Sequence, residues 1–141
     1  MAPTDKPQSH GPALAAAQFV VEGNDLVIGG LAVRDIVAET GTPCFLYDAS
    51  AMRRAYRDLA TALSGFADIF YSVKANSLPA IISLFREEGA GAEIASVGEY
   101  RAAIKAGMPP EKIIFAGPGK RAAELMEVIK GGIGEIHIES A

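Results

Sequence analysis

Residues 69–76 read IFYSVKAN, a short apolar run with one lysine, Lys74, near its end. Side chains along a β-strand point alternately to opposite faces, so a strand over residues 69–75 would place Phe70, Ser72 and Lys74 on one face. A strand of a parallel sheet is normally covered on both faces, and a lysine buried there is uncommon and usually paired. Lys74 is therefore a candidate functional residue at the carboxyl end of its strand.

Two interpretations of Lys74 are open at this point. In a dry pocket the ammonium form is disfavoured, and the neutral amine can attack an aldehyde to form a Schiff base. Alternatively, the side chain extends from the end of the strand into water. Glu93, in the run GAEIA one strand further along, is a carboxylate that would either pair with this lysine or a cationic cofactor, or be solvated at the strand edge.

The lysine strand belongs to a regular alternation of predicted strands and helices. Strands are expected over residues 69–75, 91–95, 112–116 and 135–139, a period of about 22 residues, and helices over 49–64, 77–88, 97–106 and 121–130. This order implies βαβ units, a parallel sheet and right-handed crossovers. The predicted class is therefore α/β.

An open doubly wound sheet and a (β/α)8 TIM barrel both fit four such units. A barrel takes about 250 residues, so residues 31–141 would form only its N-terminal half, a partial barrel. The last predicted strand has no helix after it and leaves an open sheet edge. We therefore expect these 141 residues to be a fragment that is inactive alone, or to need the missing part from elsewhere.

The residues that precede the predicted barrel, together with its first segments, are given separate predictions. Residues 1–17 are predicted to be a flexible tail, and residues 18–30 either a hairpin or a strand with a turn at Gly23-Asn24. A short helix is expected over 31–39 and a short strand over 44–47, with Cys44 as a buried thiol. His137 is expected in the core.

Composition excludes several classes of partner. The net charge of −4 provides no basic patch for nucleic acid, and no apolar stretch is long enough to span a membrane. The N-terminus lacks the apolar core of a signal peptide, which leaves the cytoplasm as the expected location. The loop at Gly117-Pro118-Gly119-Lys120 is either an anion-binding turn before a helix or simply a tight turn, and it is not a Walker A motif.

Taken together, the motifs resemble the fold-type III pyridoxal-phosphate decarboxylases, the group that contains the diaminopimelate and ornithine decarboxylases. The resemblance runs from about Leu26 to the last residue, and the segments that carry it are GTP (41–43), FLYD (45–48), YSVKAN (71–76), GAEIAS (91–96), GEY (98–100), AG (106–107), FAGPGK (115–120) and IES (138–140).

The resemblance implies that Lys74 holds pyridoxal phosphate as a Schiff base and that the full-length protein decarboxylates an amino acid. It also implies a homodimer and a barrel joined to a second β-domain, to which the strand over residues 18–30 would belong. Lys74, Glu93 and Ser72 are the expected cofactor-binding residues. Glu93 stands where the family usually has aspartate, and the GPGK loop (117–120) differs from that of typical diaminopimelate decarboxylases.

Two alternatives share this fold. One is an amino-acid racemase, although ANSLP (75–79) lacks the aromatic and glycine-containing run that usually follows a racemase lysine. The other is a non-catalytic pyridoxal-phosphate carrier or pseudo-enzyme. The phosphate-binding and C-terminal-domain residues of the family would lie beyond residue 141, and the sequence does not identify the amino-acid substrate.

Overall fold

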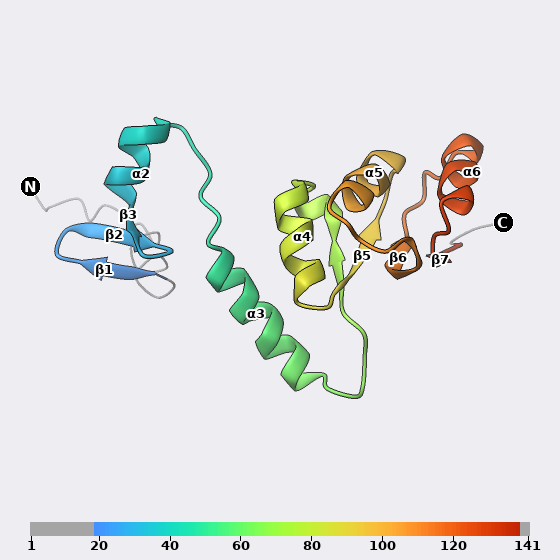
Figure 1. The fold of residues 1–141 in the computed structure, drawn as a ribbon, viewed down its shortest axis with the longest axis horizontal. Helices are drawn as coiled ribbons and strands as arrows, with labels where there is room; N and C mark the ends of the chain where they lie inside the picture. The colour runs from blue at the N-terminus through green and yellow to red at the C-terminus, as the bar shows by residue number, and fades with distance from the viewer. Residues whose placement is uncertain (1–18, 139–141) are drawn as a thin grey trace, which may run out of the picture. The chain divides into compact units, whose positions relative to one another are not determined.

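The computed structural model describes residues 19–138, and the predicted tail over 1–17 lies outside them (Figure 1). The chain divides into two units, Met1–Asp48 and Ala49–Ala141. Within residues 19–138, no helix is both long and apolar enough to cross a membrane.

The first unit holds a three-stranded antiparallel sheet of order β1-β2-β3, formed by Val20–Glu22, Asp25–Ile28 and Leu31–Ala32. Of the two alternatives predicted around Gly23-Asn24, the structure shows the hairpin, because β1 and β2 pair antiparallel on either side of these two residues. The helix predicted from residue 31 begins later, as α2 (Val33–Thr40). The reason is Gly29-Gly30, because both residues have positive φ, of 59° and 81°, as a two-residue hairpin loop of type I′ requires. That loop pairs Leu31–Ala32 with β2.

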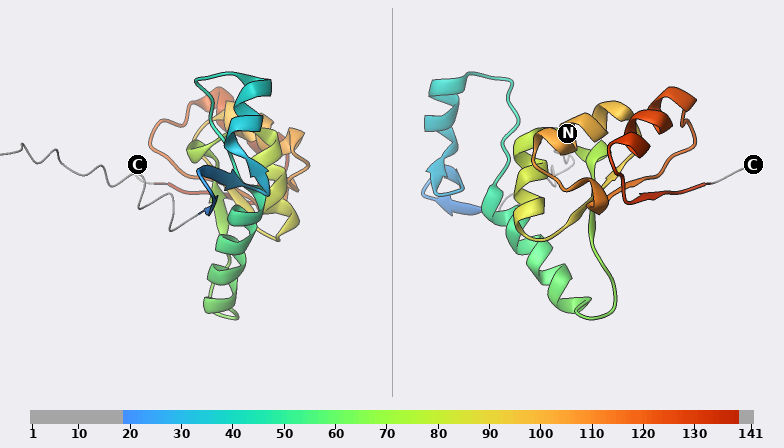
Figure 2. Two further views of the ribbon diagram at one scale, coloured as in Figure 1. Left: turned by 90° about the vertical axis from the view of Figure 1, so that its left-hand side faces the viewer. Right: turned by 45° about the vertical axis from the view of Figure 1, so that its right-hand side comes forward.

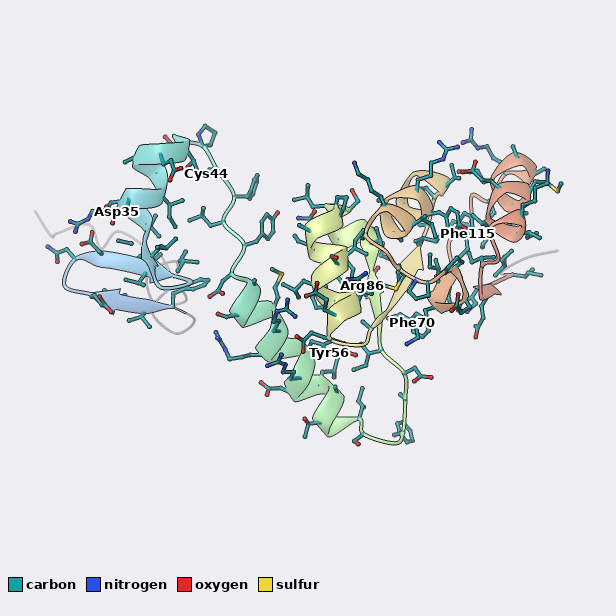
Figure 3. The ribbon with its side chains drawn as sticks, viewed as in Figure 1. Asp35, Cys44, Tyr56, Phe70, Arg86 and Phe115 are labelled. Atoms are coloured by element: carbon teal, nitrogen blue, oxygen red, sulfur yellow. The ribbon has the colours of Figure 1, made fainter. Side chains whose placement is uncertain are left out.

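The segment between α2 and the second unit departs from the prediction. Residues 44–47 form no strand, because none of the strands over 20–32 pairs with them. Phe45 is 89% exposed, and Cys44, labelled in Figure 3, is exposed as well. The prediction of a buried Cys44 thiol is therefore wrong: an apolar run is buried only where another element covers it.

The second unit is an α/β layer with a four-stranded parallel sheet, which confirms the predicted class. Its strands, in the order β4-β5-β6-β7, are Phe70–Ser72, Gly91–Ile94, Ile113–Phe115 and Glu135–Ile136. Its α-helices are α3 (Ala49–Ala62), α4 (Pro79–Glu87), α5 (Val97–Lys105) and α6 (Ala122–Lys130), and short 3-10 helices lie at Val73–Ala75 (η1) and Pro110–Lys112 (η2). All four strands are shorter than predicted, since loops and 3-10 turns take over their ends.

One face of this sheet builds the core against α4, α5 and α6, as Figures 1 and 2 show. Ala92 and Ile94 of β5 alternate into this core with Ile113 and Phe115 of β6, and all are nearly or fully buried. Helix residues that meet them are Ile82, Tyr100, Ala103 and Val128. Paired residues of neighbouring strands share a face, and the opposite face carries the row Ser72, Glu93, Ile114 and Glu135.

Helices α3 and α4 are joined by a carboxylate and two guanidinium groups. Glu88, directly after α4, lies 2.6 Å from Arg53 Nη1 and 2.6 Å from Arg57 Nε of α3. These two hydrogen bonds, Arg57 first, lower the pKa of Glu88 to about 2. Phe85 of α4 contacts the ring of Tyr56 on α3 edge to face. The pairing fixes α3 beside α4, which in turn packs against β4.

His137 is exposed, so the prediction that it belongs to the core is wrong. Its ring lies 3.3 Å from Oε2 of Glu135 in β7, the edge strand that ends at Ile136, one residue before the histidine. Among the described residues β7 pairs only with β6, and no helix follows it. Nothing within residues 19–138 therefore covers this histidine.

Gly134 provides a test of the packing that places β7. A Cβ atom on Gly134 would lie 2.2 Å from the carbonyl oxygen and 2.9 Å from the carbonyl carbon of Glu111, both rigid backbone atoms. Gly134→Ala should therefore lower the free energy of unfolding by about 1–3 kcal/mol, the usual cost of overpacking. Gly119→Ala is the control, because nothing lies within 4 Å of its added Cβ. Urea unfolding measures both, and equal midpoints for the two variants would contradict the packing described.

Candidate functional site

Lys74 lies in η1, directly after β4, at the carboxyl end of the parallel sheet. The strand predicted over residues 69–75 ends earlier than expected, at Ser72, and the 3-10 turn that follows buries Val73 completely while Lys74 is exposed. Within residues 19–138 its amine takes part in no ion pair. Lys74 is therefore accessible at this end of the sheet, and both interpretations left open by the sequence remain predictions.

Ser72 and Glu93 are brought together, as a directly opposed pair on β4 and β5. The Ser72 hydroxyl donates a hydrogen bond to Glu93 Oε2, and both side chains are half-buried. Neither is hydrogen-bonded to Lys74 in the described part of the chain. Ser72, Glu93 and Lys74 thus lie at one end of the sheet. Ser72 and Glu93 are hydrogen-bonded to each other, and Lys74 forms no hydrogen bond with either of them.

The loop after β5 is held by a capping glutamate that the sequence reading did not single out. Ser96 Oγ accepts a hydrogen bond from Glu99 N at 3.2 Å, and Glu99 Oε2 accepts one from Ala95 N at 2.7 Å. This arrangement is close to a capping box, and the Ser-x-x-Glu spacing of residues 96–99 is the signal that could have found it. It fixes the two residues that follow Ile94 at the end of β5.

A second glutamate joins the loops after β5 and β6. Glu124, on α6, is nearly fully buried. Its Oε1 accepts a hydrogen bond from Val97 N at 3.3 Å, and its Oε2 accepts from Arg121 N at 3.2 Å and Arg121 Nε at 3.0 Å. The Arg121 side chain, followed by these two backbone N–H groups, lowers the pKa of Glu124 to about 2.

The loop over residues 117–120 forms the turn between β6 and α6. Lys120 Nζ donates to the Gly117 carbonyl and lies 5.6 Å from the centre of the Phe115 ring. Gly117 has a φ of +111° and a Cβ there would lie 3.3 Å from Ala95 Cβ, so this loop packs closely against the loop after β5. Glu124 already occupies the Arg121 amide beside it. These contacts are those of a tight strand-to-helix turn, which the sequence predicted as the alternative to an anion-binding loop.

The chemistry available at this edge is that of an accessible amine beside a hydroxyl–carboxylate pair. An aldehyde is bound by a lysine amine in its neutral form. Lys74 lies at the carboxyl end of the sheet and in no ion pair with residues 19–138, so its position fits the pyridoxal group that the sequence motifs imply. The Glu93 carboxylate, which accepts a hydrogen bond from Ser72, can balance the positive charge of a cationic ring. No cluster of His, Cys, Asp and Glu side chains able to hold a metal ion occurs among residues 19–138.

Comparison with known proteins gives consistent matches. Residues 49–141 match the family model described as "Pyridoxal-dependent decarboxylase, pyridoxal binding domain". A diaminopimelate decarboxylase of Zymomonas mobilis is 38% identical over 126 residues, which cover 86% of this chain and 30% of that protein. An L-glutamyl-acyl-carrier-protein decarboxylase of Niallia circulans is 40% identical over 99 residues, 70% of this chain and 23% of that protein.

A solved structure agrees with these sequence matches. The crystal structure of diaminopimelate decarboxylase from Helicobacter pylori in complex with L-lysine is 34% identical, with a TM-score of 0.72, over 77% of this chain and 28% of that one. The chain therefore spans less than a third of the length of each of these three proteins.

The buried carboxylate of Glu124 predicts a pH-dependent stability. Its pKa in the folded protein, about 2, lies below its ordinary value of 4.5, so its contribution is complete above pH 4.5 and is lost as the pH falls towards 2. Glu124→Gln should therefore lower the thermal unfolding midpoint at neutral pH, and the two midpoints should converge as the pH falls through this window. Glu111→Gln is the control, since exposed Glu111 forms no ion pair with residues 19–138. A Glu124→Gln deficit that persisted unchanged at pH 2 would contradict the assignment.

Proposed function

This chain belongs to the pyridoxal-dependent decarboxylases, and we propose that the protein containing it decarboxylates an amino acid with pyridoxal phosphate held on Lys74. The observation that carries the proposal is the position of Lys74: an accessible amine without an ion-pair partner among residues 19–138, at the carboxyl end of a parallel sheet. Enzymes with parallel α/β sheets place their chemistry at that end.

Each of the three site residues has a task under this proposal. Lys74 Nζ would hold the aldehyde carbon of the cofactor and give it up to the amine of the substrate. Ser72 and Glu93 would bind the cofactor from the sheet face beside it, with the Ser72 hydroxyl holding the Glu93 carboxylate in one orientation. When bound, pyridoxal phosphate supplies the electron sink that accepts the electron pair left by departing carbon dioxide.

The proposed architecture is a (β/α)8 barrel of which the second unit is one half. The four parallel strands and their helices support this, because the row Ser72, Glu93 and Ile114 would then face the interior of the barrel. The first unit would contribute its strands to a second β-domain. Homodimer assembly and a cytoplasmic location complete the proposal, the first from the family and the second from the composition.

The substrate class follows from the names of the relatives. Diaminopimelate and an acyl-carrier-protein-linked glutamate are both α-amino acids with a second functional group at the far end of the side chain. We propose a substrate of this class, with a basic or carboxylate group distant from the α-carbon.

Labelling of Lys74 tests the proposed function. Borohydride reduction of the protein loaded with pyridoxal phosphate, followed by peptide mapping, should place the pyridoxyl group on Lys74. Lys74→Ala should abolish this label and reduce carbon dioxide release by at least about a hundredfold. Lys120→Ala, which removes the other lysine at this edge, should keep the label. Label on another lysine would overturn the assignment, and inversion of the substrate without carbon dioxide release would indicate a racemase.

Glu93 is tested separately, through its charge. Glu93→Gln keeps the hydrogen bond to Ser72 possible but removes the negative charge beside the proposed cofactor site. The absorption spectrum of the cofactor-loaded protein, or the pH dependence of that spectrum, should change. If the spectrum, the affinity for pyridoxal phosphate and the rate all stay as in the unaltered protein, Glu93 is only a structural residue.

A further inference from the structure

The backbone that carries Lys74 is a single 3-10 turn closed by a side chain. Tyr71 lies in β4 before the turn, and its hydroxyl donates a hydrogen bond of 2.9 Å to the carbonyl oxygen of Asn76 after the turn. This bond spans the segment Val73–Ala75 from one end to the other. The two residues are five apart, so the contact exists only because the chain turns between them.

The same turn is anchored at two further points. Val73 is fully buried in the core. Asn76 Oδ1 accepts a hydrogen bond from Leu78 N at 3.0 Å, an Asx turn that leads into α4. Lys74 is thus an exposed side chain on backbone that is held by neighbours before and after it.

The ring of Tyr71 is itself held in place. It stacks on Phe85 of α4 with ring centres 4.4 Å apart and planes 14° from parallel. Phe85 is packed on another side by Tyr56 of α3, edge to face, with ring centres 6.3 Å apart; Tyr56 is labelled in Figure 3. A side chain stacked in this way presents its hydroxyl from a fixed position, and packing alone would be served equally well by phenylalanine.

We infer that Tyr71 is a positioning residue for Lys74: its hydroxyl closes the 3-10 turn and so limits where the lysine amine can reach. This inference rests on the proposed function, in which Lys74 binds the aldehyde of pyridoxal phosphate. A lysine side chain has several rotatable bonds and loses considerable freedom when it is fixed. Holding the backbone beneath it removes part of that freedom before the reaction, which favours the productive geometry.

Tyr71→Phe removes the hydroxyl and keeps the ring, and Tyr56→Phe is its matched control on the same Phe85. Two quantities are measured on each protein. The first is hydrogen exchange of the amides of residues 73–78 without cofactor. The second is the ratio of pyridoxyl label at Lys74 to label at the distant Lys130, after a short incubation with pyridoxal phosphate and borohydride reduction.

The expected result is specific to Tyr71→Phe. Loss of one neutral hydrogen bond should speed exchange in the turn and lower the Lys74-to-Lys130 ratio by about fivefold. Tyr56→Phe should change neither quantity. Because Tyr71→Phe also lowers overall stability, Val128→Ala serves as a second comparison: it destabilises the same core from α6, far along the chain from the turn.

The outcomes separate this inference from the proposed function. If the unaltered protein places no label on Lys74, the proposed function fails, and this inference fails with it. If Lys74 is labelled but Tyr71→Phe leaves either the exchange or the ratio unchanged, the inference alone is overturned. An equal change in Val128→Ala also overturns it, because the effect would then be one of general destabilisation.

Discussion

The pairing of four short parallel strands in one register is the constraint from which the other features of the second unit follow. Because paired residues share a face, Ala92 with Ile113 and Ile94 with Phe115 are committed to the helices. The same register places Ser72 opposite Glu93 on the other face. A shift of one residue in β5 would turn Glu93 into the core and Ala92 out of it. Moving the Glu93 carboxylate into the apolar core would cost the free energy of its desolvation. This cost and the burial of Ile94, Ile113 and Phe115 favour the same register.

Side-chain carboxylates then fix the loops at the carboxyl end of this sheet. Glu99 holds the amide of Ala95, Glu124 holds those of Val97 and Arg121, and Glu93 accepts the hydroxyl of Ser72. Glu99 and Glu124 satisfy backbone donors that the end of a strand or the start of a helix leaves without a backbone partner. The result is a rigid frame in which three successive strand ends are tied to one another or to the helices that follow. Lys74 extends from this frame as an exposed amine, so the frame fixes the backbone beneath the lysine and not its side chain.

The sequence predicted what depends on local pattern, and not what depends on contacts across the chain. The alternation of elements was readable because glycine and proline end the helices, as at Gly89 and Gly107. Lys74 was found because it interrupts an apolar run within a family motif. The Tyr71–Asn76 bond had no such signal, because it forms only after β4 has given way to a 3-10 turn. Cys44 is predicted to be buried because its neighbours in sequence are apolar, and it is exposed, since such neighbours do not cover a side chain unless another element packs over it.

Both edge strands of the sheet lack a second strand partner among the described residues. Among residues 19–138, β4 pairs only with β5, and β7 only with β6, so each leaves a row of backbone donors and acceptors without strand partners, which folded proteins normally cover. An apolar groove of about 310 Å³, lined by Leu59, Tyr71 and Phe85 among others, borders β4. Closure of the sheet into a barrel would pair both edges at once. The same closure would enclose the face that carries Ser72 and Glu93 and lower the dielectric constant around their hydrogen bond, which strengthens it. Closure into the barrel proposed for the whole protein would thus pair the edges of β4 and β7 and also enclose Ser72 and Glu93.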